Sequence, residues 1–279
     1  MLQAHQRDQY QQDGYIVLPG FKSTDQIARL RWRAAEIVDD FDSGQQRSIF
    51  TTRDQLAATD DYFLRSDNTI RCFFEEEAFD EHGRLRQEKA LSINKIGHAL
   101  HDLDPVFEDF SREPALAQVA RDLGLKDAQV WKSMYIFKQP GIGGEVGWHQ
   151  DATFFDTNPV TVTTFWFALE DATRDNGCLW VEPGGHRGPM RERFVRVGDD
   201  IRMEKLDSTP WPDTSSAVPL EAKAGSLVCF HGLLPHYSAP NRSAVSRHAY
   251  TLHATCASAA YSPQNWIQRD AGLPVRGFD

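Results

Sequence analysis

The N-terminal end of the chain shows first a strand-like and then a helix-like pattern of hydrophobic positions. After a polar lead, residues 15–19 (YIVLP) form an apolar run of strand length, which predicts a short strand. Ser23, with Gln26 three residues later, carries the capping-box signal that starts a helix. Apolar side chains then recur at helical spacing as far as Phe41, so the pattern predicts a helix over about 23–41.

The pattern then becomes irregular and returns to a helical period. Residues 42–84 are charged and lack a clear period, which is typical of a solvated connection that can carry a substrate-shaping loop. Apolar positions at helical spacing predict two further helices, over 85–103 and 114–123. The Asp-Pro pair at 104–105 is expected to end the first of them, and Gly124 the second.

From residue 128 onward, short β-branched and aromatic runs alternate with turns rich in Gly, Pro and Asn. The runs are QVWKSMYIFK (129–138), TVTTFWFAL (161–169), CLWVEP (178–183), SLVCFHG (226–232) and RHAYTLHAT (247–255). Strands without helices between them predict an antiparallel sandwich or jelly roll, with the N-terminal helices over one outer face. We expect one domain over 1–279, with largely helical support over about 1–125 and a β-core over about 126–279.

Composition narrows the function classes. With 30 basic and 40 acidic residues the formal net charge is −10, which lacks the excess of Lys and Arg that binds nucleic acid or an anionic membrane. No apolar run approaches the roughly 18 residues of a spanning helix, and the polar start predicts no secretory signal. We therefore expect a soluble, cytoplasmic protein without a nucleic-acid or membrane partner.

The four cysteines lie far apart in the chain and form no CxxC pair. Their spacing argues against both a zinc ribbon and a disulfide framework. The sequence therefore predicts reduced thiols in the core.

The first candidate for chemistry is the pair His149 and Asp151. On a strand, residues i and i+2 project from the same face roughly 6–7 Å apart, so both side chains can reach one metal ion. Chance alone gives about one His-x-Asp in a chain of this composition. Taken by itself the pair is therefore uninformative, and its histidine could equally be an ordinary core or turn residue.

A second polar cluster, 85 residues later, adds His236 and Arg247. His236 can complete a set of two histidines and one carboxylate, which leaves three adjacent positions open on a non-haem Fe(II). A bidentate 2-oxo acid would fill two of these positions and O₂ the third. The far carboxylate of the oxo acid needs a rigid cationic partner, and arginine suits this role because its planar fork donates two parallel hydrogen bonds.

Several other residues compete for these roles. Arg242 is a rival to Arg247, but it lies in the polar turn PNRS (240–243), where side chains usually point to water. His231 is the alternative third ligand; because it ends an apolar run just before a glycine, we interpret it as structural.

The remaining polar and glycine features are given structural interpretations. His186, in the loop PGGH (183–186), is interpreted as a loop anchor. His98 and His101 fall on a predicted helix and are expected to be packed or solvated. The glycine-rich segment 141–144 is read as hairpin punctuation, because no strand-then-helix context follows it.

The ordered motifs of the chain resemble the phytanoyl-CoA dioxygenase family of Fe(II)/2-oxoglutarate oxygenases, most closely its animal domain-containing members. The similar segments span nearly the whole chain and are far more specific than the triad alone. They are DGYIV (13–17), NKIGHALH (94–101), MYIFKQP (134–140), GGEV (143–146), HQDA (149–152), LEDAT (169–173), NGCLW (176–180), PGGH (183–186), HG (231–232), AYTLH (249–253) and SPQNW (262–266).

The resemblance implies a double-stranded β-helix that uses Fe(II), 2-oxoglutarate and O₂. It implies that the iron is held by His149, Asp151 and His236. It also implies that 2-oxoglutarate is bound by a second set of residues: Arg247 with Ser238 at its distal carboxylate, and Lys95, Met134 and Trp166 along the pocket. A carboxylate at Asp151 favours hydroxylation over halogenation, because related halogenating enzymes lack that carboxylate.

The expected activity is hydroxylation of a C–H bond in a small-molecule substrate, with release of succinate and CO₂. A CoA thioester would need a basic, phosphate-binding rim, and no dense run of Lys or Arg supplies one; the chain also ends without a peroxisomal tripeptide. A metabolite, a natural product or a nucleic-acid base are the alternatives, in that order. Two rival functions are a cupin-type metalloenzyme without an oxo acid and a binding or sensing module without turnover. The sequence does not indicate the oligomeric state.

Overall fold

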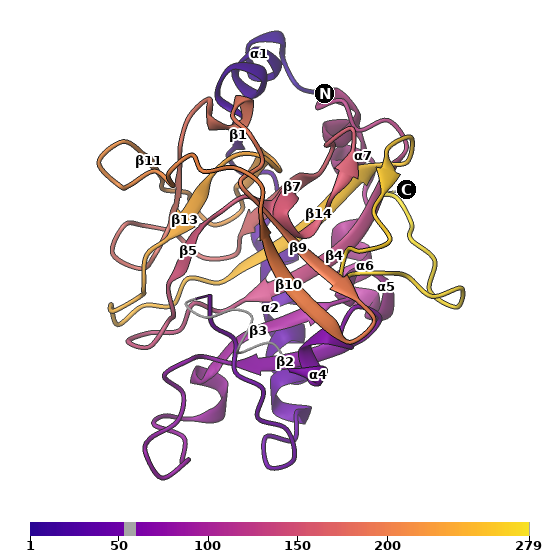
Figure 1. The fold of residues 1–279 in the computed structure, drawn as a ribbon. Helices are drawn as coiled ribbons and strands as arrows, with labels where there is room; N and C mark the ends of the chain where they lie inside the picture. The colour runs from indigo at the N-terminus through magenta and orange to yellow at the C-terminus, as the bar shows by residue number, and fades with distance from the viewer. Residues whose placement is uncertain (53–59, 279) are drawn as a thin grey trace.

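The computed structural model describes residues 1–52 and 60–278, and a seven-stranded antiparallel sheet forms its centre (Figure 1). In sheet order its strands are β1 (Tyr15–Leu18), β12 (Leu227–His231), β7 (Thr163–Ala168), β14 (Ala249–Cys256), β4 (Ala128–Ile136), β3 (Ile93–His98) and β2 (Ile70–Phe74). Each of the five apolar runs after residue 128 contains a strand, as the sequence predicted. Four of these strands, β4, β7, β12 and β14, belong to this sheet, and the fifth belongs to the second sheet.

A second, four-stranded antiparallel sheet contributes the opposite wall of a cavity of about 370 Å³. Its strands, in order, are β11 (Val218–Leu220), β8 (Leu179–Val181), β13 (His236–Ser238) and β5 (Val146–His149). Two small hairpin-like pairs flank these sheets, β9 (Glu192–Val197) with β10 (Asp200–Lys205) and β6 (Thr157–Asn158) with β15 (Ala260–Tyr261). Two sheets around one cavity form the double-stranded β-helix that the sequence predicted.

The central strands of the main sheet separate an apolar face from a polar face. On β14, Tyr250 and Leu252 belong to the main hydrophobic core, whereas Thr251 and His253 line the cavity. This arrangement follows from the two-residue period of a strand, which sends successive side chains to opposite faces. The same period therefore builds the core and the cavity from one stretch of sequence.

Helices cover the apolar face of the main sheet (Figure 1). The α-helices are α1 (Ala4–Asp13), α2 (Thr24–Asp40), α4 (Asp61–Leu64), α5 (Leu100–Leu103), α6 (Pro105–Ser111) and α7 (Pro114–Asp122). The part of the chain that the structure describes also contains three short 3-10 turns: η1 (Lys89–Leu91), η2 (Asp151–Phe154) and η3 (Gly185–Arg187). Phe110 of α6 packs edge-on against Phe167 of β7, with 5.2 Å between ring centroids, and so joins helix to sheet.

Two of the three predicted helices are confirmed. The hydroxyl of Ser23 accepts a hydrogen bond from the backbone N–H of Gln26 at 3.2 Å, and the Gln26 side chain returns to the Ser23 backbone, which is the expected capping box of α2. α7 ends just before Gly124, whose positive φ of 95° suits glycine. Within the described residues, no helix combines the length and apolar character needed to cross a membrane.

The predicted helix over 85–103 is wrong. This segment contains η1, then the fully buried strand β3, and only then the single turn of α5. β3 lies between β4 and β2, so pairing on both edges outweighs a helical spacing of apolar residues. Asp104 does not end a helix but caps the N-terminus of α6. Its carboxylate accepts hydrogen bonds from the backbone N–H groups of Val106 and Phe107, and Pro105 occupies the first position of the helix.

The N-terminal part is consequently less helical than predicted, because β1, β2 and β3 all enter the main sheet. The predicted connection over 42–84 includes the edge strand β2 and also Phe50 and Thr52, which line the cavity. Residues 53–59 of that connection lie outside the described residues. The four cysteines are free and buried, as the sequence predicted.

Candidate active site

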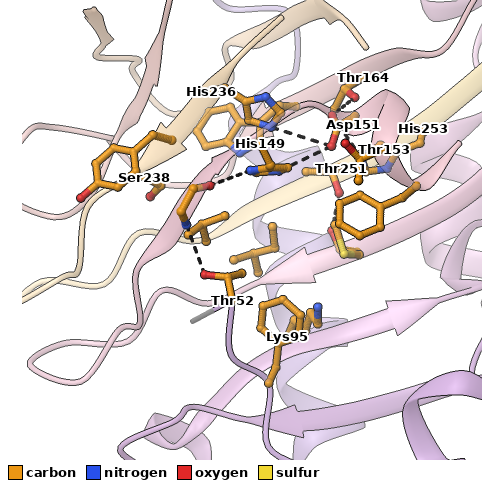
Figure 2. Close-up of a pocket in the computed structure, with 18 of the residues that line it drawn as sticks. Thr52, Lys95, His149, Asp151, Thr153, Thr164, His236, Ser238, Thr251 and His253 are labelled. Atoms are coloured by element: carbon orange, nitrogen blue, oxygen red, sulfur yellow. Dashed lines mark hydrogen bonds and ion pairs between the residues drawn. The ribbon is translucent and has the colours of Figure 1, made fainter. Parts of the chain in front are cut away.

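Three side chains with metal-ligating atoms meet at one end of the cavity (Figure 2). His149 is the last residue of β5, Asp151 begins η2, and His236 begins β13. His149 and His236 are direct partners in the register of the β5–β13 pair, which brings the rings together. One ligand atom from each of the three residues lies within 4.8 Å of the others.

The two imidazoles present the same nitrogen to Asp151. Nε2 of His149 is 3.7 Å, and Nε2 of His236 is 3.8 Å, from Oδ1 of Asp151. On the other side of each ring, Nδ1 lies against a backbone carbonyl: Gly147 O at 2.8 Å for His149 and Leu234 O at 3.0 Å for His236. Because a carbonyl only accepts, Nδ1 carries the proton and the lone pair of Nε2 points to the common centre.

Asp151 is buried but ionised. Burial raises the pKa of its carboxyl, and the imidazoles of His236, His253 and His149 outweigh that effect, so the pKa lies well below its usual range. Oδ2 accepts a short hydrogen bond from the Thr164 hydroxyl and lies 3.5 Å from Nε2 of His253. Oδ1 is thus left to face the two histidines of the triad.

The donor set suits a divalent transition metal. Burial, with a further contribution from the nearby His236, lowers the pKa of His149 to about 3, so this imidazole is neutral at pH 7. A metal ion needs deprotonated ligands, and two neutral imidazoles with one carboxylate form the facial set of non-haem Fe(II) sites. The structure therefore brings together the three residues that the sequence singled out.

Arg247 lies in the same cavity and is only 2% exposed. Two of its guanidinium nitrogens form hydrogen bonds. Nε donates to Gly177 O at 3.1 Å, and Nη2 donates to Ser238 Oγ at 3.4 Å. Its guanidinium carbon lies 5.4 Å from the centre of the Trp166 ring, within cation–π range. Nη1 is buried and has no hydrogen-bond partner among the described residues.

The unpartnered guanidinium nitrogen of Arg247 can donate to an anion that enters the cavity. Burial lowers the pKa of Arg247 to about 10, so the group remains protonated at neutral pH. A buried charge without a partner is costly, and an incoming carboxylate removes that cost. Arg247, Ser238 and Trp166 thus lie where the sequence interpretation requires them.

The other two predicted pocket residues also line this cavity. Met134 projects from β4, and Lys95 projects from β3 with its ammonium nitrogen only 3.0 Å from the centre of the Phe50 ring. Burial, and then repulsion from Lys132, lower the pKa of Lys95 well below its usual value. All eight residues named from the sequence therefore share one cavity.

The rival residues lie elsewhere. The Arg242 guanidinium pairs with Glu77 at 2.5 Å at the surface, and Arg242 is not among the cavity-lining residues. His231 accepts a hydrogen bond from Leu233 N at 3.1 Å and lies beside His186, with 5.5 Å between ring centroids. His186 contacts Gln11 O at 3.2 Å and so ties its loop to the N-terminal helix.

The two histidines that were placed on a predicted helix are in fact buried in different environments. His98 ends β3, with Nδ1 2.7 Å from Ser66 Oγ, and His101 lies in α5, 2.8 Å from Ser133 Oγ. The glycine-rich segment is a turn but not the hairpin that the sequence predicted, because it connects β4 of the main sheet to β5 of the second sheet; Gly143 pairs with the distant Asn241.

Thr164, His253 and Lys132 are among the cavity residues that escaped the sequence interpretation. Thr164 and His253 both touch Asp151. A usable signal was present, because Thr164 lies two residues from Trp166 and Lys132 two residues from Met134, on the same strand faces. The two-residue period could therefore have extended the predicted pocket.

Comparison with known proteins gives one family. The family model for phytanoyl-CoA dioxygenase matches residues 10–249. Phytanoyl-CoA dioxygenase of Arabidopsis thaliana is 46% identical over 265 residues, covering 95% of this chain and 93% of the plant protein. Phytanoyl-CoA dioxygenase domain-containing protein 1 of Bos taurus is 44% identical over 282 residues, covering 98% of this chain and 97% of the bovine protein.

The fold is also shared with solved structures. The epimerase SnoN from nogalamycin biosynthesis, solved in complex with Fe³⁺, alpha-ketoglutarate and nogalamycin RO, superposes with a TM-score of 0.64 at 16% sequence identity. The match covers 97% of this chain and 90% of SnoN. Together with the matching family model and the extent of identity to the curated relatives, these comparisons show that the chain belongs to the phytanoyl-CoA dioxygenase family.

Proposed function

We propose that this protein is an Fe(II)- and 2-oxoglutarate-dependent oxygenase that hydroxylates a C–H bond of a small molecule and releases succinate and CO₂. Membership of the family supports the coarse activity. The single observation that carries the proposal is the presence, in one cavity, of a two-histidine, one-carboxylate set and a buried arginine with an unused donor.

In this proposal His149, Asp151 and His236 hold the metal. The backbone carbonyls at Nδ1 fix both rings, and the Thr164 hydroxyl fixes the carboxylate, so the ligands are oriented before the metal arrives. Pre-orientation of this kind raises metal affinity, because fewer side-chain rotations are lost on binding.

Arg247 and Ser238 bind the distal carboxylate of 2-oxoglutarate. Nη1 of Arg247 is the free donor, while Nε and Nη2 are held by Gly177 and Ser238, which aim the fork. Trp166 packs beside the guanidinium, and Met134 and Lys95 form further wall of the same cavity. These contacts position the oxo acid and keep water away from it.

Iron with 2-oxoglutarate and O₂ supplies the oxidation, in which the oxo acid loses CO₂ and becomes succinate while one oxygen atom enters the substrate. The contribution of the protein is geometry and exclusion of water. Aromatic side chains supply much of the cavity wall, among them Phe50, Phe63, Trp148, Phe154 and Phe194. An enclosure of this kind favours reaction of the bound substrate over side reactions with solvent.

Arg247 also separates this proposal from its rivals. A cupin-type metalloenzyme without an oxo acid has no use for a buried guanidinium with an unused donor beside the metal site. A binding module without turnover could retain the same groups, so turnover itself must be measured.

The test is anaerobic reconstitution with Fe(II) and 2-oxoglutarate, followed by admission of O₂ and quantification of succinate with and without a metabolite extract. We expect succinate that depends on iron and rises with the extract. Binding of 2-oxoglutarate without succinate under any extract would instead indicate a sensing module. Metal binding without affinity for 2-oxoglutarate would indicate a cupin-type enzyme.

A further inference from the structure

Lys132 is a buried cation in the cavity that the proposed oxygenase mechanism does not use. It lies on β4, two residues from Met134 on the same face, and is 8% exposed. Its cross-strand partner is His253, which contacts Asp151 of the triad. Lys132 therefore lies one strand position away from the residues around the metal site.

The other three lysines that the structure describes as buried each have a close partner for the ammonium group. Lys22 pairs with Glu113 at 2.8 Å, and Lys138 donates to two carbonyls, of Gly144 at 2.6 Å and Ser238 at 3.3 Å. Lys95 has the Phe50 ring at 3.0 Å.

Lys132 Nζ has only two distant rings, Phe155 at 5.7 Å and Trp266 at 5.6 Å. Within the described residues it forms no hydrogen bond and no ion pair with a carboxylate. Distances near 6 Å are the outer limit of a cation–π contact, so the two rings offset little of the burial cost. Burial lowers the pKa of Lys132 to about 8, although the negative charge of Asp151 acts in the opposite direction, and the group is still mostly protonated at pH 7.

Lys132 and Arg247 have no contact partner in common among the described residues. The guanidinium of Arg247 lies against Ser238 and the Trp166 ring, whereas the ammonium of Lys132 lies near the two rings named above. The cavity therefore contains a second cation besides the one assigned to 2-oxoglutarate.

The rest of the cavity limits what can bind there. Its partly exposed lining is mainly aromatic or apolar, with Phe50, Trp148, Phe154, Met203 and Tyr237. A volume of about 370 Å³ falls near the lower end of the range of about 300–1,000 Å³ for ligand pockets. Once 2-oxoglutarate is bound, the remaining space suits a compact body with an apolar surface.

We propose that Lys132 binds an acidic group of the primary substrate, so that the substrate is a small organic carboxylate whose apolar or aromatic body lies along the cavity wall. This inference rests on the proposed oxygenase function and names its substrate class. The ammonium supplies the counter-charge inside the cavity, and the aromatic lining supplies contact area for the body. The contact fixes the substrate relative to the metal, which makes Lys132 a residue that determines specificity.

The experiment uses three carboxylate probes that differ in length, phenylacetate, 3-phenylpropanoate and 4-phenylbutanoate, each with its primary amide. Binding is measured by calorimetry on the full chain loaded with Mn(II) and 2-oxoglutarate without O₂, so that the metal and Arg247 are already engaged. We expect the parent protein to bind at least one acid about 10- to 100-fold more tightly than its amide, as for a hydrogen bond to a charged group.

Lys132→Gln should remove that preference for the acid and leave both the affinity for the amide and the affinity for 2-oxoglutarate unchanged. Lys132→Arg should keep most of the preference, because it keeps the charge. Lys126→Gln removes the same charge from an exposed position and is the matched control; it should behave like the parent. If Lys132→Gln does not fold, Lys132→Met, which keeps the length of the side chain, replaces it.

The proposal is overturned if the parent shows no preference for any acid over its amide, or if Lys132→Gln retains the preference. It is also overturned if Lys132→Gln loses affinity for 2-oxoglutarate itself, because Lys132 would then be a cosubstrate contact. Failure of the oxygenase proposal is a separate result: 2-oxoglutarate would not bind to the parent. The acid-to-amide comparison would then be repeated on the metal-loaded protein alone, and the same ratio would decide.

Discussion

Two buried carboxylates in this fold differ in their basic neighbours: both contact histidine, at 3.1 Å from His101 for Asp102, but Asp102 is also paired with arginines. The Asp102 side chain in α5 is fully enclosed, and arginine Nη2 atoms lie 2.6 Å away on Arg112, 3.0 Å on Arg276 and 3.5 Å on Arg269. Arginine stays protonated throughout the physiological range, so these partners are permanent cations. The charge of Asp102 is thus cancelled by the chain itself.

Among the described residues, the basic groups within ion-pair distance of Asp151 are all imidazoles, at 3.5–3.8 Å. Burial lowers the pKa of His149 to about 3 and also lowers that of His253, so neither ring is a permanent cation as an arginine is. Arg247, in the same cavity, conversely forms no ion pair with a carboxylate of the described residues.

The difference separates a structural charge cluster from a binding site. Around Asp102 opposite charges touch and no ligand is needed. In the cavity Asp151 and Arg247 form no ion pair with each other. A neutral hydroxyl group holds each of them, and each retains an atom that can bind a ligand. We infer that a bound cation neutralises the charge of Asp151 and that a bound anion neutralises the charge of Arg247.

The largest effect is expected for the third ligand. His236→Ala should abolish both iron retention and succinate formation, because it removes one of three metal ligands. His231→Ala is the matched control, since its ring lies outside the cavity, and it should reduce activity or stability by a much smaller factor. Iron content after desalting and succinate yield measure both. The reverse ranking would transfer the ligand role to His231.

At the Asp102 cluster we expect the opposite: a loss of stability without a loss of iron binding. Asp102→Asn should lower the free energy of unfolding by about 3–5 kcal/mol, because it leaves the buried Arg112 and Arg269 without their counter-charge. Urea denaturation measures this loss, and iron binding by the folded fraction should be unchanged. A stable Asp102→Asn protein that fails to bind iron would remove the distinction between the two carboxylates.

The pH dependence sharpens the same comparison. Burial raises the pKa of Asp102, but His101 and the arginines outweigh it, and the folded-state pKa lies well below the usual value. A depressed pKa contributes stability above the unfolded value of about 3.9, and that contribution is lost as the pH falls further. The difference in unfolding free energy between the parent and Asp102→Asn should therefore shrink below about pH 4. A difference that grows on acidification would contradict the assignment.

Variants of Arg247 test whether its positive charge, which has no carboxylate partner among the described residues, binds 2-oxoglutarate. Arg247→Ala should weaken 2-oxoglutarate binding by about 30- to several-thousandfold, or about 2–5 kcal/mol, while iron binding barely changes. Arg247→Lys should recover only part of the loss, because a point charge cannot reproduce paired donors. Arg242→Ala, at the surface, should titrate with 2-oxoglutarate like the parent. A loss with Arg242→Ala alone would assign the carboxylate to that residue instead.

A smaller effect is expected for the hydroxyl that holds Asp151. Thr164→Val keeps the shape of the side chain but removes its hydrogen bond to the carboxylate. We expect a loss of about 10- to 100-fold in metal affinity, as is common for groups that orient a ligand. The matched variant is Thr163→Val, one residue away and outside the cavity lining. Equal metal affinities for the two variants would show that Thr164 does not orient the ligand.

Local patterns in the sequence predicted much of this site. The apolar and aromatic runs 129–138 and 247–255 predicted β4 and β14, the residue spacing suggested the triad with Arg247, and the family resemblance implied the other cavity residues. The significance of Lys132 and His253 depends on the pairing of β4 with β14, which no local pattern contains. β3 was mistaken for a helix because its neighbours on both edges, and not its own spacing, decide its conformation.

The Asp102 cluster could not be predicted from the sequence either, because it also depends on contacts between distant segments. Arg269 and Arg276 are more than 160 residues away from Asp102 along the chain and reach it only through the complete fold. Long-range charge pairing thus escapes analysis of the sequence alone. The His-x-Asp pair was informative only together with the other family motifs, and the structure places His149 at the end of β5 but Asp151 in the 3-10 turn η2 and not on the expected strand.

The most direct test of the central claim is the visible spectrum of the protein under anaerobic conditions with one equivalent of Fe(II). The triad assignment predicts a weak charge-transfer band that develops only after 2-oxoglutarate is added, and that is absent from the double variant His149→Ala, His236→Ala. A band of equal strength in the double variant would show that the iron and the oxo acid meet elsewhere.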